Sequence, residues 1–93
     1  QALHSPEVIL QQAAIAAFGE IGDLTALDEI LAFAQSEDWL VRQRLAEALG
    51  NLPSEKGTSA LKYLAKDSHP QVSEAAQISL DRLAKSTVAS DKT

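Results

Sequence analysis

The apolar residues of this chain recur in three copies of one frame, spaced 31 residues apart. Residues 5–23 align without a gap with residues 36–54, and residues 67–83 repeat the frame once more. The shared positions are Leu10, Ala14, Ala17, Phe18 and Ile21, then Val41, Leu45, Ala48, Leu49 and Leu52, then Val72, Ala76, Ser79, Leu80 and Leu83. Their spacing (i, i+4, i+7, i+8, i+11) forms one stripe of an α-helix. Each copy therefore begins with a helix, and the fixed period indicates stacked helical units.

Residues between the copies predict a second helix after each of the first two. Ser5 and Ser36 stand where N-caps are expected, while Gly22-Asp23 and Pro53-Ser54 end the first helices and cap the second ones. The second helices are expected over residues 24–35 and 55–66. Their predicted core residues are Leu27, Ile30, Leu31 and Ala34 in one, and Leu61, Leu64 and Ala65 in the other.

Two glycines fall inside the predicted first helices. Gly19 and Gly50 occupy the same position of the frame, where glycine costs about 1 kcal/mol relative to alanine. We expect a neighbouring helix to approach closely there. In the third copy Asp81 takes this position, and no second helix follows that would need to approach it.

The two ends of the chain differ in polarity. The helix over residues 6–21 adds Ile9, Ala13, Ile15 and Ala16 to its stripe, so we expect it to be covered on both sides, by upstream repeats or by a partner. The third copy is polar enough to close a stack. Residues 86–93 contain little apolar surface and are predicted to be disordered.

The net charge of −5 is unevenly distributed. Residues 1–41 contain seven acidic residues and no Lys or Arg, whereas residues 42–93 contain eight basic and six acidic residues. Because nucleic-acid binding needs a continuous basic stripe, this distribution argues against it. The chain has no cysteine, which excludes disulfides and thiolate zinc sites and fits a reducing cytoplasm.

We find no set of residues with a catalytic or metal-binding pattern. His4 and His69 are 65 residues apart, each at a predicted helix boundary, where capping or exposure is the simplest role. No nucleophile elbow of the form G-x-S-x-G occurs, and Asp28-Glu29 has no partner acid at helical spacing. No catalytic residue, metal or resident cofactor is predicted.

One stretch carries a resemblance to a known family. Residues 38–52 read D-x-x-V-R-x-x-L-A-E-A-L-G-x-L, which resembles the HEAT-like repeat of phycobilisome lyase-type proteins. The arginine position holds Gln11 in the first copy and Ser73 in the third, and the resemblance covers residues 5–85. It implies an all-α fold, an α-solenoid of HEAT-like helical hairpins, with the second helices lining its concave side. It also implies a structural role for Arg42, a hydrogen bond to the turn of a neighbouring repeat.

The expected organisation is one domain over residues 1–85, a fragment of a longer solenoid. It contains about two and a half repeats and five helices, with repeats at 5–35, 36–66 and 67–85. Because so few repeats make a small cradle, we expect a non-catalytic protein–protein interaction module. We expect the chain to be cytoplasmic, and the resemblance implies that its client is a phycobiliprotein or a phycobilisome component.

The alternative is a fragment of a bilin lyase, which attaches or removes phycocyanobilin. Arg42 and Arg44 would then bind propionates, Asp38 the pyrrole N–H groups, and Trp39 would stack on the bilin. However, the two arginines lie about 200° apart around a helix, so they cannot both face one ligand.

The candidate partner surface combines residues from three helices. Trp39 and Arg44 depart from the repeated frame, which has Val8 and Pro70, and Ala13 and Ala75, at their positions. If the second helices line the concave face, it grades from acidic to basic, with Tyr63 as an aromatic anchor. The candidates are Asp28, Glu29, Trp39, Arg44, Lys62, Tyr63 and Lys66.

Overall fold

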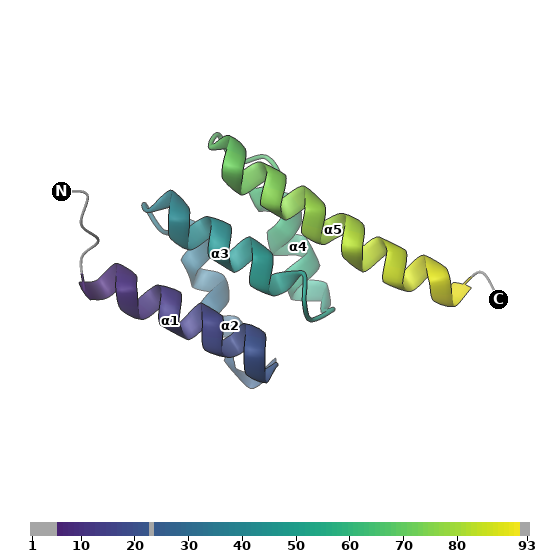
Figure 1. Cartoon of the computed structure of the whole chain (residues 1–93), viewed down its shortest axis with the longest axis horizontal. Coiled ribbons are helices and arrows are strands. Elements are labelled where there is room, and N and C mark those ends of the chain that lie inside the picture. The colour runs from purple at the N-terminus through teal and green to yellow at the C-terminus, as the bar shows by residue number, and fades with distance from the viewer. Residues whose placement is uncertain (1–5, 23, 92–93) are drawn as a thin grey trace.

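A computed structural model describes residues 6–22 and 24–91, and every regular element in these ranges is a helix (Figure 1). The elements are α1 (Pro6–Ile21), η1 (Leu24–Ala26), α2 (Leu27–Leu31), η2 (Ala32–Gln35), α3 (Trp39–Leu49), α4 (Glu55–Leu64) and α5 (Pro70–Asp91). The all-helical fold with five α-helices agrees with the prediction.

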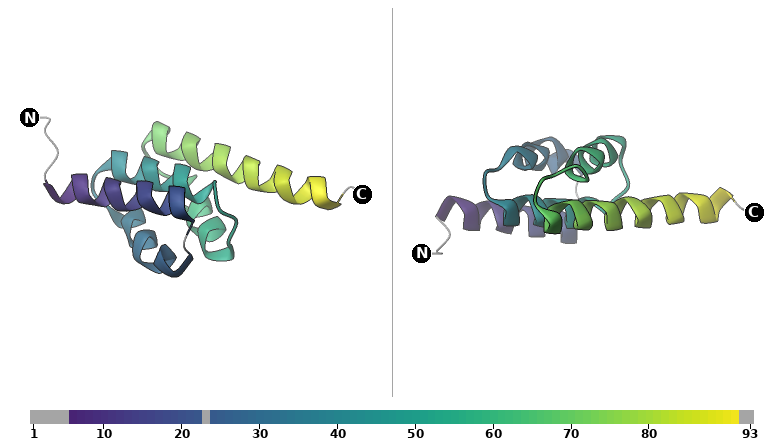
Figure 2. Two further views of the ribbon diagram at one scale, coloured as in Figure 1. Left: turned by 60° about the horizontal axis from the view of Figure 1, so that its bottom comes forward. Right: turned by 90° about the horizontal axis from the view of Figure 1, so that it is seen from above.

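The helices form two layers. The first layer contains α1, α3 and α5, which lie side by side, and the second contains α4 and the segment from η1 to η2 (Figure 2). Each second-layer segment connects two consecutive first-layer helices. This alternation is the hairpin stacking that the 31-residue period predicts.

The core lies between the layers and is centred on α3. Of the eleven residues of α3, five are buried: Val41, Leu45, Ala46, Ala48 and Leu49. Leu61 and Leu64 of α4 and Val72 and Ala76 of α5 complete its most buried part, each 0% exposed. The apolar frame of the second copy therefore faces inward, as predicted. The frame of the third copy also faces inward at Val72 and Ala76 of α5.

The first copy of the frame behaves differently. Leu10 and Ile21 are 69% and 74% exposed, and Ala14 and Ala17 are also exposed. Only Ile15 and Phe18 of α1 are buried. The predicted inward stripe is thus wrong for α1 except at Phe18, and Ile15 faces the core. In α3 the stripe residue Ala48 faces Gly19 of the preceding helix α1, whereas the described residues place no helix before α1.

Local capping residues define where the helices begin and end. The α1 helix ends at Ile21, and Gly22 follows it with a φ of 72°, a left-handed conformation that suits glycine. Asp38, not Ser36, is the N-cap of α3, because its Oδ1 accepts a hydrogen bond from Leu40 N at 2.9 Å. Ser54 caps α4 as predicted, accepting from Gly57 N at 2.9 Å. Ser5 and Asp23 lie outside the described residues.

Two predicted segments have different secondary structure. Residues 24–35 are not one α-helix, because η1 and η2 flank the five residues of α2. These 3₁₀ turns satisfy terminal backbone groups with i→i+3 bonds. At the other end, α5 continues to Asp91, whereas we expected disorder over residues 86–93. Residues 86–91 contain no Gly or Pro, and extending an existing helix costs far less than nucleating one.

Candidate interaction surfaces

Arg42 joins α3 to the turns on either side of the second repeat. Its Nε donates to Asp67 Oδ2 at 2.8 Å and its Nη2 to Asp67 Oδ1 at 3.2 Å. A third donor, Nη1, reaches the backbone oxygen of Ser36 at 2.7 Å. The Arg42 and Asp67 side chains are only 17% and 10% exposed. Arg42 thus contacts the turn of the following repeat through a two-pronged ion pair, here called the Arg42–Asp67 latch.

The environment of Asp67 stabilises its charged form. Burial by itself would raise the pKa of this carboxyl. The hydrogen bond from Arg42, the backbone N–H of His69 and the positive charge of Arg42 oppose burial, and together they lower the pKa below its usual value. The sequence did not single out Asp67, because its partner lies 25 residues away and only the stacking of repeats brings them together.

Trp39 lies at the same junction. Its indole ring stacks on the imidazole of His69, with ring centroids 4.1 Å apart and planes 10° from parallel. His69 precedes α5, and its Nδ1 accepts from Gln71 N at 3.3 Å, which is a capping role. The stack joins the start of α3 to the start of α5, so one face of Trp39 covers the repeat junction.

Gly50 marks the closest approach between two first-layer helices. A Cβ at this position would lie 2.6 Å from Ser79 Cβ and 3.1 Å from Ser79 Cα. Ser79 Oγ donates to the backbone oxygen of Ala46 at 2.7 Å, so a side chain of α5 bonds the backbone of α3. The approaching helix is therefore the next first-layer helix, α5. The expected close approach of a neighbouring helix is confirmed at Gly50, but this helix is not α4, the second helix of the same repeat.

Gly19, at the same position of the frame, has more room. A Cβ there would meet Ala48 Cβ at 3.7 Å, an ordinary van der Waals contact. The α1–α3 junction is therefore less tightly packed at this point than the α3–α5 junction.

The second layer holds four of the seven predicted partner-surface residues, and a fifth, Lys66, lies in the turn that follows α4. Asp28 pairs with Lys56 at 2.9 Å, an exposed bridge between α2 and α4, and Glu29 is exposed beside it. Tyr63, which is 54% exposed, and Lys66 line a cleft of about 470 Å³ with Gln35, Ser36 and Ser68. Lys62 faces a separate cleft beside Pro53 and Leu83. The charged residues thus do not converge on one site.

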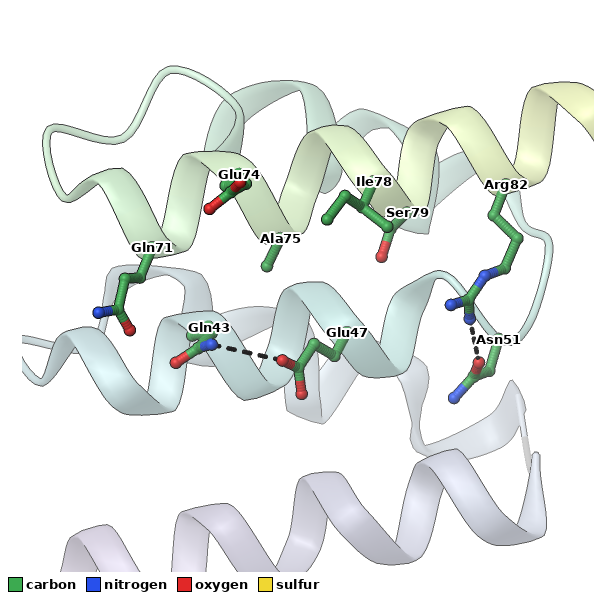
Figure 3. Close-up of a pocket in the computed structure, with 9 residues that line it drawn as sticks. All are labelled: Gln43, Glu47, Asn51, Gln71, Glu74, Ala75, Ile78, Ser79 and Arg82. Carbon is green, nitrogen blue, oxygen red and sulfur yellow. Dashed lines mark hydrogen bonds between the residues drawn. The ribbon is translucent and has the colours of Figure 1, made fainter.

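Arg44 lies in the first layer. It is exposed, pairs with Glu47 at 3.3 Å, and borders a largely apolar groove between α1 and α3 that Ile9, Ala13 and Ala16 line. A more polar groove follows between α3 and α5, where Gln43 contacts Glu47 and Arg82 donates to Asn51 Oδ1 at 2.8 Å (Figure 3). Arg44 is therefore distant from the Tyr63 cleft.

Of the four residues expected for a bilin site, three lie around the start of α3, and Arg44 lies apart from them. Arg42 lies in the latch beside the Tyr63 cleft, while Arg44 borders the α1–α3 groove. Asp38 caps α3, and Trp39 stacks on His69. Asp38, Trp39 and Arg42 thus share one end of α3, where each makes an internal contact, and only Arg44 faces another groove.

The described residues contain neither a metal-binding cluster nor a membrane-spanning helix. Within residues 6–22 and 24–91, no three or more His, Cys, Asp or Glu side chains cluster as metal ligands would. None of the helices in these ranges combines the length and apolarity needed to cross a bilayer. His4 lies outside the described residues.

The alternating layers, the 31-residue period and the tight contact at Gly50 define an α-helical repeat protein. Residues 1–81 match the HEAT repeats family, and the chain belongs to that family. Curated proteins and solved structures gave no match. HEAT repeats commonly mediate protein–protein interaction, because stacked helices present a long continuous surface.

Proposed function

We propose that this chain is a non-catalytic protein–protein interaction module that binds its partner at the second-layer face, around the Tyr63 cleft. The observation that supports this surface most directly is the exposed Tyr63 beside an open cleft. Tyrosine is enriched among the residues that dominate binding energy, because it buries a large area at little entropic cost.

The cleft has polar groups suited to a protein segment. The amide of Gln35 can donate and accept at once, which matches a peptide backbone. Lys66 is exposed and forms no ion pair with any described residue. Its ammonium group therefore favours an acidic partner segment. The Arg42–Asp67 latch borders the cleft and holds its wall in place.

The client class comes from the resemblance alone. It points to a phycobiliprotein or a phycobilisome component, which this chain would meet in the cytoplasm, and a bilin lyase fragment is the alternative. The motif residues that carry the resemblance have internal roles here: Asp38 caps α3, Arg42 forms the latch and Gly50 lies against α5. The client therefore needs its own test, separate from that of the surface.

Calorimetry with a purified phycobiliprotein tests the client. Binding supports it, and no heat at tens of micromolar would remove it. Adding free phycocyanobilin to the chain tests the lyase alternative, which predicts a change in the visible spectrum. A non-catalytic module without a resident cofactor predicts that the spectrum stays unchanged.

Photo-crosslinking tests the surface whatever the client is. A photoreactive phenylalanine at position 63 should crosslink the partner, and Tyr63→Ala with Lys66→Ala should weaken its binding at least tenfold. Lys62→Ala is the matched control, a lysine on the same helix that faces another cleft. If Lys62→Ala weakens binding while the double variant does not, the Tyr63 cleft is the wrong surface.

A further inference from the structure

One side of α1 is an apolar surface that the described chain leaves uncovered. Leu10, Ala14, Ala17 and Ile21 follow the spacing i, i+4, i+7, i+11, so they lie in one row along the helix. All four are exposed, Leu10 by 69% and Ile21 by 74%. We refer to these four residues as the open face of α1.

The open face has the composition of a helix-packing surface. Its first three residues correspond by the repeat to Val41, Leu45 and Ala48 in α3, and to Val72, Ala76 and Ser79 in α5. All six of those residues are buried. The equivalent positions are thus buried in both helices that follow another first-layer helix, and the open face is suited to contact with another helix.

The sizes of the four side chains are symmetric about the middle of the row. Two large residues, Leu10 and Ile21, flank two small ones, Ala14 and Ala17. We propose that the open face pairs antiparallel with the open face of a second copy of this chain. In that register Leu10 lies opposite Ile21 of the second copy, and Ala14 opposite Ala17 of the second copy. A two-fold interface requires this kind of self-complementarity, and the central alanines let the helices approach closely.

A head-to-tail arrangement of copies fits less well. It would place the outer side of α5 against the open face, as α1 lies against α3 inside the chain. On α5 the residues equivalent to Ile15 and Gly19 are Gln77 and Asp81. Covering a carboxylate with Ala17 would cost its desolvation without a partner. The polarity of α5 thus favours the symmetric pair.

The acidic residues of α1 lie beside the open face. Glu7 and Glu20 are both exposed, and no Lys or Arg occurs in residues 1–41. In the antiparallel register Glu20 lies opposite Gln11 of the second copy. The carboxylates of the two α1 helices therefore do not face each other directly. The remaining repulsion acts over longer distances, where about 0.15 M salt screens it. Association should therefore become tighter as salt is raised.

The expected dimer is weak. With 16 residues, α1 is about 24 Å long, and a contact between two such helices buries less than about 1,200 Å² in total. Interfaces of this size are typical of transient association. The dimer should therefore form and dissociate over an accessible concentration range.

Sedimentation equilibrium of the whole chain tests the proposal. The average mass should rise from the 9.9 kDa monomer towards the dimer with concentration, and more so at high salt. Leu10→Glu should raise the dimer dissociation constant at least tenfold. Ile78→Glu is the matched control, because Ile78 is 55% exposed but lies on α5. A monomer at every concentration, or equal weakening by both variants, would overturn the proposal.

Crosslinking tests the register. The chain has no native cysteine, so single cysteines can be placed freely. A mixture of Leu10→Cys and Ile21→Cys should be joined by a short bismaleimide, because these positions face each other. Leu10→Cys alone should not be crosslinked, since the two cysteines at position 10 would lie about 16 Å apart along the helix axis. Efficient crosslinking of Leu10→Cys to itself would indicate a parallel pair and contradict the proposal. Circular dichroism of each variant checks that the helices are intact.

Discussion

The two junctions between first-layer helices are built on one sequence frame but held together differently. At the α3–α5 junction, Gly50 lies against Ser79, and Ser79 Oγ bonds the backbone of α3. The latch and the Trp39–His69 stack add contacts at its edge. At the α1–α3 junction, Gly19 makes ordinary contacts, and α1 buries only Ile15 and Phe18.

This difference shows that a repeated sequence position need not have a repeated energetic role. Arg42 has a carboxylate to bind because Asp67 follows α4, while the equivalent position of the first copy holds Gln11. A glycine is needed only where the next helix approaches its backbone. The α3–α5 junction should therefore contribute more stability than the α1–α3 junction.

The largest expected effect comes from breaking the latch. Replacing Arg42 with alanine leaves the Asp67 carboxylate, 10% exposed, without its ion-pair partner. We expect a loss of about 3 kcal/mol in the free energy of unfolding, measured by urea denaturation. Arg44→Ala is the control: its ion pair is half exposed, so the change should stay below about 1 kcal/mol. Similar losses of unfolding free energy for both variants would show that the latch contributes no more than an exposed ion pair.

Acid should remove part of the stability that the Arg42–Asp67 latch contributes. Because the pKa of Asp67 is lower in the folded chain, its charge stabilises the fold above the unfolded value of about 3.9. That stabilisation is lost as pH falls through the folded pKa. The difference in unfolding free energy between the wild type and Asp67→Asn should therefore shrink between pH 6 and pH 3. A difference that stays constant over this range would contradict the assignment.

Gly50→Ala tests the closest contact of the α3–α5 junction. Its new methyl group would overlap Ser79 Cβ and crowd the α5 backbone, so one helix must shift. We expect a loss of about 1–3 kcal/mol, measured by thermal or urea unfolding. No loss would mean that α5 can move away at little cost.

Gly19→Ala should have the smallest effect and the opposite sign. The position lies within α1, and an added Cβ meets no atom closer than 3.7 Å. Alanine should therefore stabilise the chain by up to about 1 kcal/mol through its helix propensity. A destabilising result would show that the α1–α3 junction is as tight as the α3–α5 junction.

Much of the fold follows from the apolar pattern. The helix order, most of the core of α3 and α4, and the glycine that admits a close helix could be predicted, because they depend on periodicity within one repeat. The orientation of α1 could not be predicted from this pattern. Its stripe matches that of α3, but which side is buried depends on whether a helix precedes it, and Ile15 and Phe18 face the core instead.

The contacts between repeats were harder to predict. Asp67 and His69 lie in the turn before α5, and their partners, Arg42 and Trp39, are on α3. Pairing them requires the relative position of two repeats, which a one-dimensional frame does not contain. The capping of α3 by Asp38 instead of Ser36 depends on a local choice between two good caps only two residues apart.

Native-state hydrogen exchange measures the difference between the two junctions most directly. The measurement is best made on Leu10→Glu, which removes any contribution from pairing of the open faces. Amides within α3, and those of α5 over residues 74–80, should exchange only through global unfolding, whereas amides of α1 should exchange through a local opening of lower free energy. Equal protection of α1, α3 and α5 would contradict the account, because it would mean that all three helices unfold as one unit.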